Sequence, residues 1–197
     1  MSKKTKSWLL LILLAIIWGT SFILMDKSMR DENRNPLLSP NEVAALRMFL
    51  SGVVLFPIFF KNIKLAFSRD WIWFLLVGLL GNFIPAFLFT NAIESLSSSF
   101  TGTLNSLVPI FSVIVAFFVF KQQLTFKTLI GVLLGLAGTS LLIYFHNGGF
   151  DKIQIFPTLL VVLATICYAF SLNIIKNKLS HISSISITGI SLGFMLP

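Results

Sequence analysis

Five long stretches without a charged residue dominate the sequence. They cover residues 8–25, 71–93, 97–120, 128–150 and 153–175, and each is 18 to 24 residues long. A helix needs about 20 apolar residues to cross the roughly 30 Å hydrocarbon core of a bilayer. Helices also satisfy their own backbone hydrogen bonds, as lipid requires. The sequence therefore predicts an all-α fold, a polytopic transmembrane helical bundle.

Two shorter apolar segments complete the series. Residues 43–60 contain a single charge, Arg47, and residues 182–197 contain none. Charged residues make up only 11% of the chain, against roughly 25% in soluble domains. The one cysteine, Cys167, excludes an intrachain disulfide. The predicted helices lie at about 8–25, 40–60, 71–93, 97–120, 125–145, 155–175 and 182–197.

The basic residues of the loops predict the orientation of the helices. With a cytoplasmic N-terminus, ten lysines and arginines fall in cytoplasmic loops and four in outer loops. An excess of this kind on the cytoplasmic side is typical of membrane proteins. We therefore expect an integral protein of the plasma membrane (the inner membrane of a bacterium) with its N-terminus inside. The net charge of +8 then reflects topology and contact with the lipid bilayer, and no nucleic-acid partner is expected.

The sixth predicted helix repeats features of the first. Residues 18–25 align with residues 168–175 at an offset of 150, so that an aromatic residue meets an aromatic one and Ser21 meets Ser171. Five helices per repeat is an odd number, so the second repeat begins on the opposite side of the membrane. Inverted repeats of this kind are typical of secondary transporters.

The repeat divides the chain into three parts. Residues 1–146 form a complete first five-helix repeat, residues 147–154 an extracytoplasmic loop, and residues 155–197 the start of a second repeat. We interpret the second repeat as truncated, because the sequence stops within its second helix. We therefore expect the chain alone to be inactive unless a second copy, as in a homo-dimer, or a separate half completes it.

Short motifs along the whole chain resemble the EamA-type domain of the drug/metabolite transporter superfamily. Their order and spacing carry the resemblance, since none is specific alone. The chain departs from the family pattern at Gln122, where an acidic residue is common, and in lacking the last three helices. The motifs are Trp18-Gly19-Thr20-Ser21-Phe22, Ser39-Pro40, Ala45-Leu46-Arg47-Met48-Phe49-Leu50, Asn91-Ala92-Ile93, Ser97-Ser98-Ser99, Leu107-Val108-Pro109-Ile110-Phe111 and the glycine-rich residues 131–138.

This resemblance implies ten helices in two inverted domains around a central cavity. It implies a secondary-active transporter, often an exporter, of small metabolites such as amino acids or amphipathic solutes, with no cofactor. The sequence offers no catalytic or metal site: His146 and His181 lie in opposite predicted loops, and no phosphate-binding loop occurs. Two alternatives stay open. One is an intramembrane enzyme or lipid-handling protein whose catalytic residues lie in absent sequence, and the other is an inactive truncated fragment.

Arg47 is the one charged residue among residues 43–60, well inside the second predicted membrane helix. A charge in this environment is costly and marks a functional candidate, here one that attracts a carboxylate of the substrate. The alternative is that Arg47 snorkels to the outer head groups or pairs with Glu42 or Glu94. The family resemblance agrees with a functional role, because family members often carry an arginine at the position of Arg47.

Other polar and aromatic side chains within the apolar segments are candidates for the substrate pathway. Thr101 and Asn105 share one stripe of the fourth helix with Ser98 and Ser112, and such a stripe avoids lipid. Hydrogen bonding between helices is the alternative, and anchoring at the membrane interface is the alternative for Trp18. The full set of candidates is Trp18, Ser21, Arg47, Asn82, Asn91, Thr101, Asn105, Tyr168 and Asn173.

Prolines and glycines predict the shape of individual helices. Asn82 and Asn91 lie on opposite sides of an ideal helix, so both can line one cavity only if Pro85 bends the segment. Pro109 likewise predicts a kink or a helix end. A flat surface for close helix packing is predicted by three glycines at spacings of four and three, which are Gly131, Gly135 and Gly138.

Overall fold

The structure is a computed structural model that describes residues 3–31, 33, 35–147 and 154–196. Within these ranges it is helical, with one isolated β-bridge between Arg30 and Pro36. The elements are α1 (Lys3–Met29), α2 (Pro40–Lys61), α3 (Ile63–Ala66), α4 (Trp71–Gly78), the π-helix η1 (Leu79–Phe83), α5 (Ile84–Ser95), α6 (Ser98–Leu104), α7 (Leu107–Phe118), α8 (Phe126–Asn147), α9 (Ile155–Lys178) and α10 (Ser184–Gly193).

Six of the helical segments among the described residues are long and apolar enough to cross a membrane. They are Lys4–Met29, Pro40–Lys61, Trp71–Ser95, Ser98–Phe118, Phe126–Phe145 and Ile155–Lys178. The seventh, Ser184–Gly193, is shorter. The all-α helical bundle with six spans and a short seventh helix is thus confirmed. The charge-free runs located these spans to within a few residues, because a charge marks where a helix leaves the apolar region.

Two of the spans are interrupted, and a proline follows each interruption. The third span passes through η1 just before Pro85, where a wider turn accommodates a ring that cannot donate a backbone hydrogen bond. The fourth span is broken at Asn105 and Ser106, shortly before Pro109. The predicted distortions at Pro85 and Pro109 are therefore present.

A capping box fixes the start of α2. The Ser39 hydroxyl accepts a hydrogen bond from the Glu42 backbone N–H at 3.3 Å, and the Glu42 carboxylate accepts one from the Ser39 backbone N–H at 2.7 Å. Pro40 occupies the first turn, where no N–H is needed. These reciprocal bonds satisfy backbone donors that would otherwise be unpaired, so α2 begins sharply after the α1–α2 loop.

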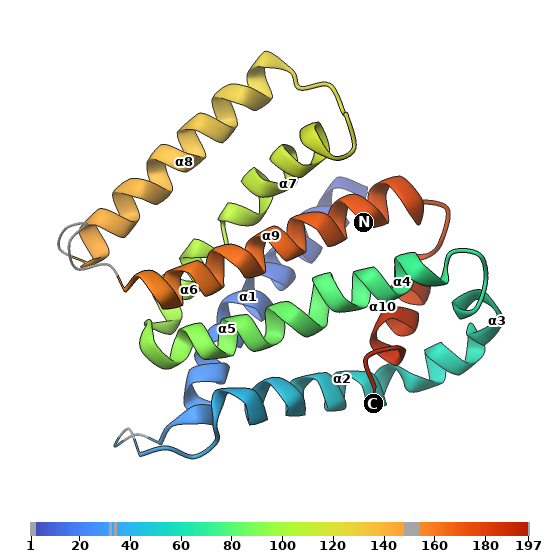
Figure 1. Ribbon diagram of the computed structural model, residues 1–197, viewed down its shortest axis with the longest axis horizontal. Coiled ribbons are helices and arrows are strands. Elements are labelled where there is room, and N and C mark those ends of the chain that lie inside the picture. The colour runs from blue at the N-terminus through green and yellow to red at the C-terminus, as the bar shows by residue number, and fades with distance from the viewer. Residues whose placement is uncertain (1–2, 32, 34, 148–153, 197) are drawn as a thin grey trace.

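Helix α9 runs through the middle of the bundle and packs against both α5 and α7 (Figure 1). Helix α10 packs against α2 and α4. Helix α8 stands apart, in contact mainly with α7, and no residue of its most apolar stretch is buried. The loop before α2 and the short helix α3 lie at opposite ends of the bundle (Figure 1), as expected when α2 spans a membrane.

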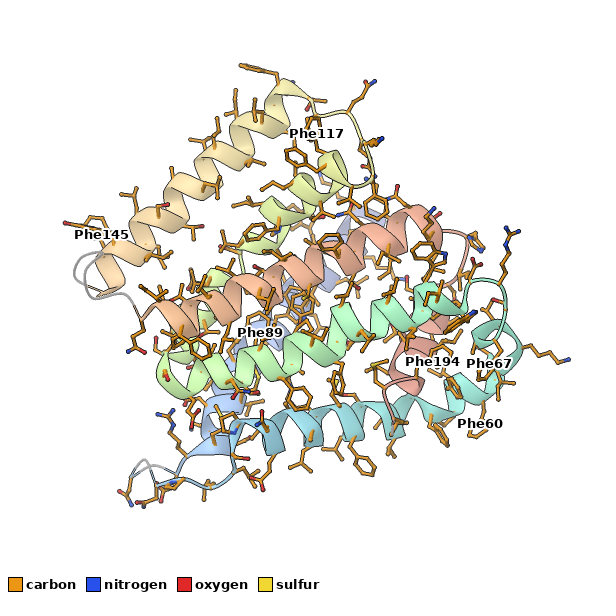
Figure 2. All side chains as sticks on the ribbon, viewed as in Figure 1. Phe60, Phe67, Phe89, Phe117, Phe145 and Phe194 are labelled. Atoms are coloured by element: carbon orange, nitrogen blue, oxygen red, sulfur yellow. The ribbon has the colours of Figure 1, made fainter. Side chains whose placement is uncertain are left out.

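Apolar side chains fill the bundle and also cover its outside. Phe89 is buried in the centre, whereas Phe60, Phe67 and Phe145 project from the perimeter (Figure 2). A soluble domain of this size would not expose so many large apolar side chains in long helices. The exposed rings are the surface that a membrane helix presents to lipid.

Glycines let several helices approach closely. A Cβ atom at Gly81 of η1 would overlap the hydroxyl of Ser171 in α9. A Cβ atom at Gly78 would come within 2.5 Å of the Ser191 carbonyl oxygen in α10. These positions need glycine because the neighbouring helix occupies the space of a side chain.

Candidate functional site: an apolar cavity between the first and fourth spans

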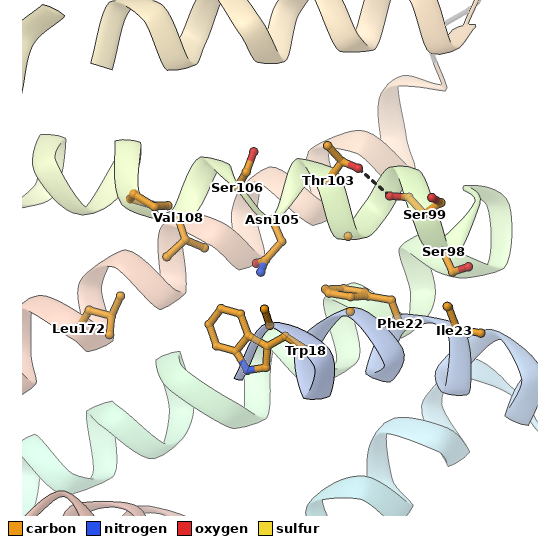
Figure 3. A pocket seen from close by; sticks show the side chains of 14 residues that line it. Trp18, Phe22, Ile23, Ser98, Ser99, Thr103, Asn105, Ser106, Val108 and Leu172 are labelled. Carbon is orange, nitrogen blue, oxygen red and sulfur yellow. Dashed lines mark hydrogen bonds between the residues drawn. The ribbon is translucent and has the colours of Figure 1, made fainter. Parts of the chain in front are cut away.

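Helices α1, α6 and α7, together with Leu172 of α9, line a cavity of about 790 Å³. This volume lies within the roughly 300–1,000 Å³ of typical small-molecule sites. The cavity is mostly apolar, and no charged side chain lines it in the part of the chain that the structure describes. Its aromatic and polar lining residues are Trp18, Phe22, Ser98, Ser99, Thr103, Asn105 and Ser106 (Figure 3).

Asn105 enters this cavity because the fourth span is broken at its position. Pro109 has no N–H to give to the Asn105 carbonyl four residues earlier. The Val108 N–H donates to that carbonyl instead, at 3.1 Å. The Asn105 side chain is only 9% exposed, and its Oδ1 has no hydrogen-bond partner among the described residues. Figure 3 shows the amide directed toward the Trp18 indole across the cavity.

Helix α1 supplies the opposite wall. The Trp18 side chain is 51% exposed and lies against the cavity. Phe22, one turn later, approaches α6 at Gly102, where a Cβ atom would come within 3.2 Å of the Phe22 ring. A larger residue at Gly102 would therefore push α1 away and alter the width of the cavity.

Phe22 also belongs to an aromatic row that crosses the bundle. Its ring lies 5.4 Å from that of Phe89 in an edge-to-face arrangement, and Phe89 stacks on Tyr168 at 5.8 Å between ring centroids. Aromatic pairs of this geometry stabilise packing by about 0.5–1.5 kcal/mol each. The row connects the cavity wall on α1 with the middle of α9.

Arg47 lies beyond this row rather than in the cavity. Its Nη1 donates to the sulfur of Met25, one turn after Phe22 on α1, at 2.7 Å. No carboxylate oxygen of a described residue lies within 4.0 Å of the guanidinium. The alternative pairing with Glu42 or Glu94 is not found, and the Glu42 carboxylate binds Ser39 instead. Arg47 is thus a partly buried cation without a counter-ion in the described structure.

The model of the EamA-like transporter family matches residues 5–144 of the chain. The chain belongs to this family. The match covers the walls of the cavity on α1, α6 and α7 and also Arg47, so the site described above lies almost entirely in family sequence. Together with the six apolar spans, the match makes the chain an integral membrane protein.

Several curated relatives are named as transporters. The S-adenosylmethionine/S-adenosylhomocysteine transporter of Chlamydia muridarum is 27% identical over 92% of this chain and 57% of its own length. The protein of the same name from Chlamydia trachomatis serovar D is 28% identical over 92% of this chain and 56% of its own length. The uncharacterized transporter YetK of Bacillus subtilis is 28% identical over 74% of this chain and 46% of its own length. The chain spans about half the length of the relatives it matches. No solved structure matches it.

Of the predicted pathway residues of this EamA-like chain, the structure brings Trp18 and Asn105 together at the cavity. Thr101 is fully buried outside the cavity lining, and its hydroxyl has no partner among the described residues. The Ser21 hydroxyl donates to the Trp18 carbonyl of its own helix at 2.9 Å. Tyr168 lies in the aromatic row.

The remaining predicted asparagines lie elsewhere in the EamA-like bundle. Asn82 is half-buried in η1, outside the cavity lining. Asn91 donates to the Asn41 side chain of α2 at 2.9 Å and to the Phe87 carbonyl at 2.8 Å. The wider turn before Pro85 does not bring Asn82 and Asn91 to one cavity. Asn173 is buried and donates to Ser112 and Ala169.

Of the three glycines in the fifth span, one lies close to a neighbouring helix and two do not. A Cβ atom at Gly135 would come within 2.7 Å of the Ile110 side chain in α7, so α8 and α7 approach each other there. Nothing lies within 4 Å of such an atom at Gly131 or Gly138. Close packing along all three glycines stays a prediction.

Four of the aromatic and polar cavity residues, Phe22, Ser99, Thr103 and Ser106, were not predicted from the sequence. Thr103 and Ser106 share a spacing of three, which would have marked a second polar stripe on the fourth span. The break at Asn105 and Ser106 changes which side chains share one side of the span. Pro109 signalled that break, but not how it would redirect the side chains.

Asn173 is expected to hold α9 against α7. Its Nδ2 donates to the Ser112 carbonyl at 2.9 Å and lies 3.1 Å from the Ser112 hydroxyl. We expect Asn173→Ala to lower the free energy of unfolding by about 0.6–1.7 kcal/mol, as for other interhelical bonds in membranes. Thermal unfolding in detergent measures this, and a double-mutant cycle with Ser112→Ala isolates the side-chain pair. An unchanged melting temperature for Asn173→Ala would contradict the assignment.

Proposed function

We propose that the chain forms the solute-binding part of a secondary-active transporter that moves a small metabolite across the membrane. The observation that carries the proposal is the cavity of about 790 Å³, with the Asn105 side chain directed across it toward Trp18 (Figure 3). Family membership and the six apolar spans support transport over an intramembrane enzyme.

The proposed solute is an amphipathic metabolite of the S-adenosylmethionine or S-adenosylhomocysteine kind. This follows the names of the relatives in two Chlamydia species. Such a solute combines a flat ring system with an amino-acid carboxylate. The mostly apolar cavity beside Trp18 suits the ring, and the unpaired Arg47 beyond the aromatic row suits the carboxylate. We propose that transport is directed outward and is driven by a solute or ion gradient.

The test is exchange of radiolabelled S-adenosylmethionine in proteoliposomes that contain this chain. A second copy of the chain is the proposed partner, since the family resemblance implies ten helices around the cavity. We therefore expect saturable exchange at high protein density and little at one copy per vesicle. S-adenosylhomocysteine should compete. Absence of exchange at every density, with correctly inserted protein, would overturn the proposal for this chain.

A plasma-membrane location with a cytoplasmic N-terminus is also proposed. The ten-to-four bias of loop lysines and arginines supports it. In a Cys167→Ser background, we expect Arg30→Cys to react with an impermeant maleimide added outside intact cells, and Lys64→Cys to react only after the cells are opened. Arg30 directly follows α1 and Lys64 lies in α3, and the loop before α2 lies at the opposite end of the bundle from α3 (Figure 1). The reverse labelling pattern would contradict the orientation.

A further inference from the structure

We propose that the loop between α7 and α8 and the last turn of α9 bind an anionic phospholipid. Lysines on the two segments hold the phosphate, and apolar side chains beside the loop contact the acyl chains. The inference goes beyond the proposed function, because it involves neither the cavity nor transport.

The end of the bundle that carries this loop has many cations and few groups that neutralise them. This basic end comprises the end of α2, α3, the start of α4, the α7–α8 loop, the start of α8 and the end of α9 (Figure 1). The cations of these segments are Lys61, Lys64, Arg69, Lys121, Lys127, Lys176 and Lys178. Asp70, the one described carboxylate there, lies 3.7 Å from the His181 imidazole. No carboxylate oxygen of a described residue lies within 4.0 Å of any of these cations. An anionic ligand can therefore bind at this end without displacing a protein counter-ion.

Gln122 joins the loop to α9 and brings two lysines to neighbouring segments. Its Oε1 accepts a hydrogen bond from the Lys176 Nζ at 3.2 Å, and its Nε2 donates to the Asn177 Oδ1 at 3.0 Å. This neutral amide orients Lys176 without cancelling its charge. Lys121 directly precedes Gln122, and both lysines are exposed. A phosphate can therefore accept charge-assisted hydrogen bonds from both segments.

The backbone of Lys121 is in the left-handed region, with a φ of 52°. This conformation is uncommon for a residue with a side chain and favours glycine. Lysine thus occupies a position that the backbone favours for glycine. Such an exception is expected where the side chain itself has a role in binding.

Exposed rings beside the loop favour a lipid over a soluble phosphate compound. Phe118, at the end of α7, is 72% exposed, and Phe126, at the start of α8, is 77% exposed. Helix α8 contacts mainly α7, and no residue of its most apolar stretch is buried. Basic side chains next to an exposed apolar surface match a phospholipid, which has an anionic headgroup above apolar chains.

The test is a lipid titration of the chain in a neutral detergent, with native mass spectrometry to measure bound lipid. We expect phosphatidylglycerol to bind about tenfold or more tightly than phosphatidylcholine with the same acyl chains. A lysine beside an anionic headgroup contributes about fivefold in affinity. Lys121→Gly and Lys176→Gln should therefore each weaken phosphatidylglycerol binding by that factor and leave phosphatidylcholine binding unchanged. The matched control Lys64→Gln removes a charge from α3, at the same end of the bundle, and should bind phosphatidylglycerol as the unaltered chain does.

Lys121→Gly removes the side chain but suits the left-handed backbone, so a loss of lipid in this variant does not reflect unfolding. Equal affinity for the two lipids in the unaltered chain would overturn the inference. So would an equal loss of binding in Lys64→Gln, because it would show diffuse attraction to the whole basic end. Displacement of the lipid by glycerol phosphate at the same concentration would assign the lysines to a soluble phosphate compound instead. If Lys121→Gly and Lys176→Gln bind lipid normally and change only the melting temperature, the lysines stabilise the fold and the inference is wrong.

Discussion

Replacement of Gly81 by leucine is expected to lower the melting temperature of the chain in detergent by roughly 5–10 °C. Any side chain at this position overlaps the Ser171 hydroxyl of α9. Helix α9 is packed on its other side by α7, so it cannot simply move away. Overpacking at such a contact strains both helices. Size-exclusion chromatography after stepwise heating measures the loss of the folded monomer.

Two further variants distinguish a local clash from a general effect of losing a glycine. Gly81→Ala alone should destabilise the chain, and Gly81→Ala combined with Ser171→Gly should recover most of the loss, since the second change frees the occupied space. Gly138→Leu adds a side chain where nothing lies within 4 Å and should leave the melting temperature unchanged. If Gly81→Leu and Gly138→Leu unfold at the same temperature, the close approach of η1 and α9 is wrong.

Arg47→Ala is expected to reduce solute exchange at least tenfold while the amount of protein in the membrane stays nearly constant. A charge-assisted hydrogen bond to a carboxylate contributes about 1.5–3 kcal/mol, which corresponds to roughly ten- to hundredfold in affinity. Removing Arg47 leaves no buried carboxylate unpaired, because none of the described ones contacts it. Exchange in proteoliposomes and quantitative immunoblotting give the two readouts.

The control for this experiment changes the neighbour of Arg47 instead. Met25→Leu removes the sulfur that accepts from the guanidinium but conserves volume and charge, so exchange should persist. A parallel loss of exchange and abundance in Arg47→Ala would instead indicate that the arginine mainly stabilises the fold.

The spans could be predicted from the sequence because lipid imposes one simple requirement on every residue of a span. A charge-free run of about 20 residues nearly suffices to identify a span, and the six long helices agree with the predicted runs. The breaks within spans were predictable only as positions near Pro85 and Pro109. Whether a proline produces a wider turn, as in η1, or a complete break, as at Asn105, depends on neighbouring helices.

The site was less predictable, and two asparagines show why. Asn105 and Asn173 have the same side chain, and both lie within apolar stretches of the sequence. Asn173 meets Ser112, 61 residues away, and becomes a helix contact. Asn105 lines a cavity, and its Oδ1 has no partner in the part of the chain that the structure describes. The difference arises from contacts between distant helices, which the spacing of residues within one helix does not encode.

The π-helix in the third span has a consequence for how this protein can change in evolution. A residue added to or removed from a helix rotates everything after it by about 100° relative to what precedes it. Removing one residue between η1 and Phe89 would turn Phe89 away from Phe22 and Tyr168 while leaving α4 in place. A π-helical turn holds one residue more than an α-helical turn, so the same deletion within Leu79–Phe83 can be absorbed by a return to α-helix. We therefore expect related chains to vary in length by one residue within η1 and to keep the distance in sequence from η1 to Phe89.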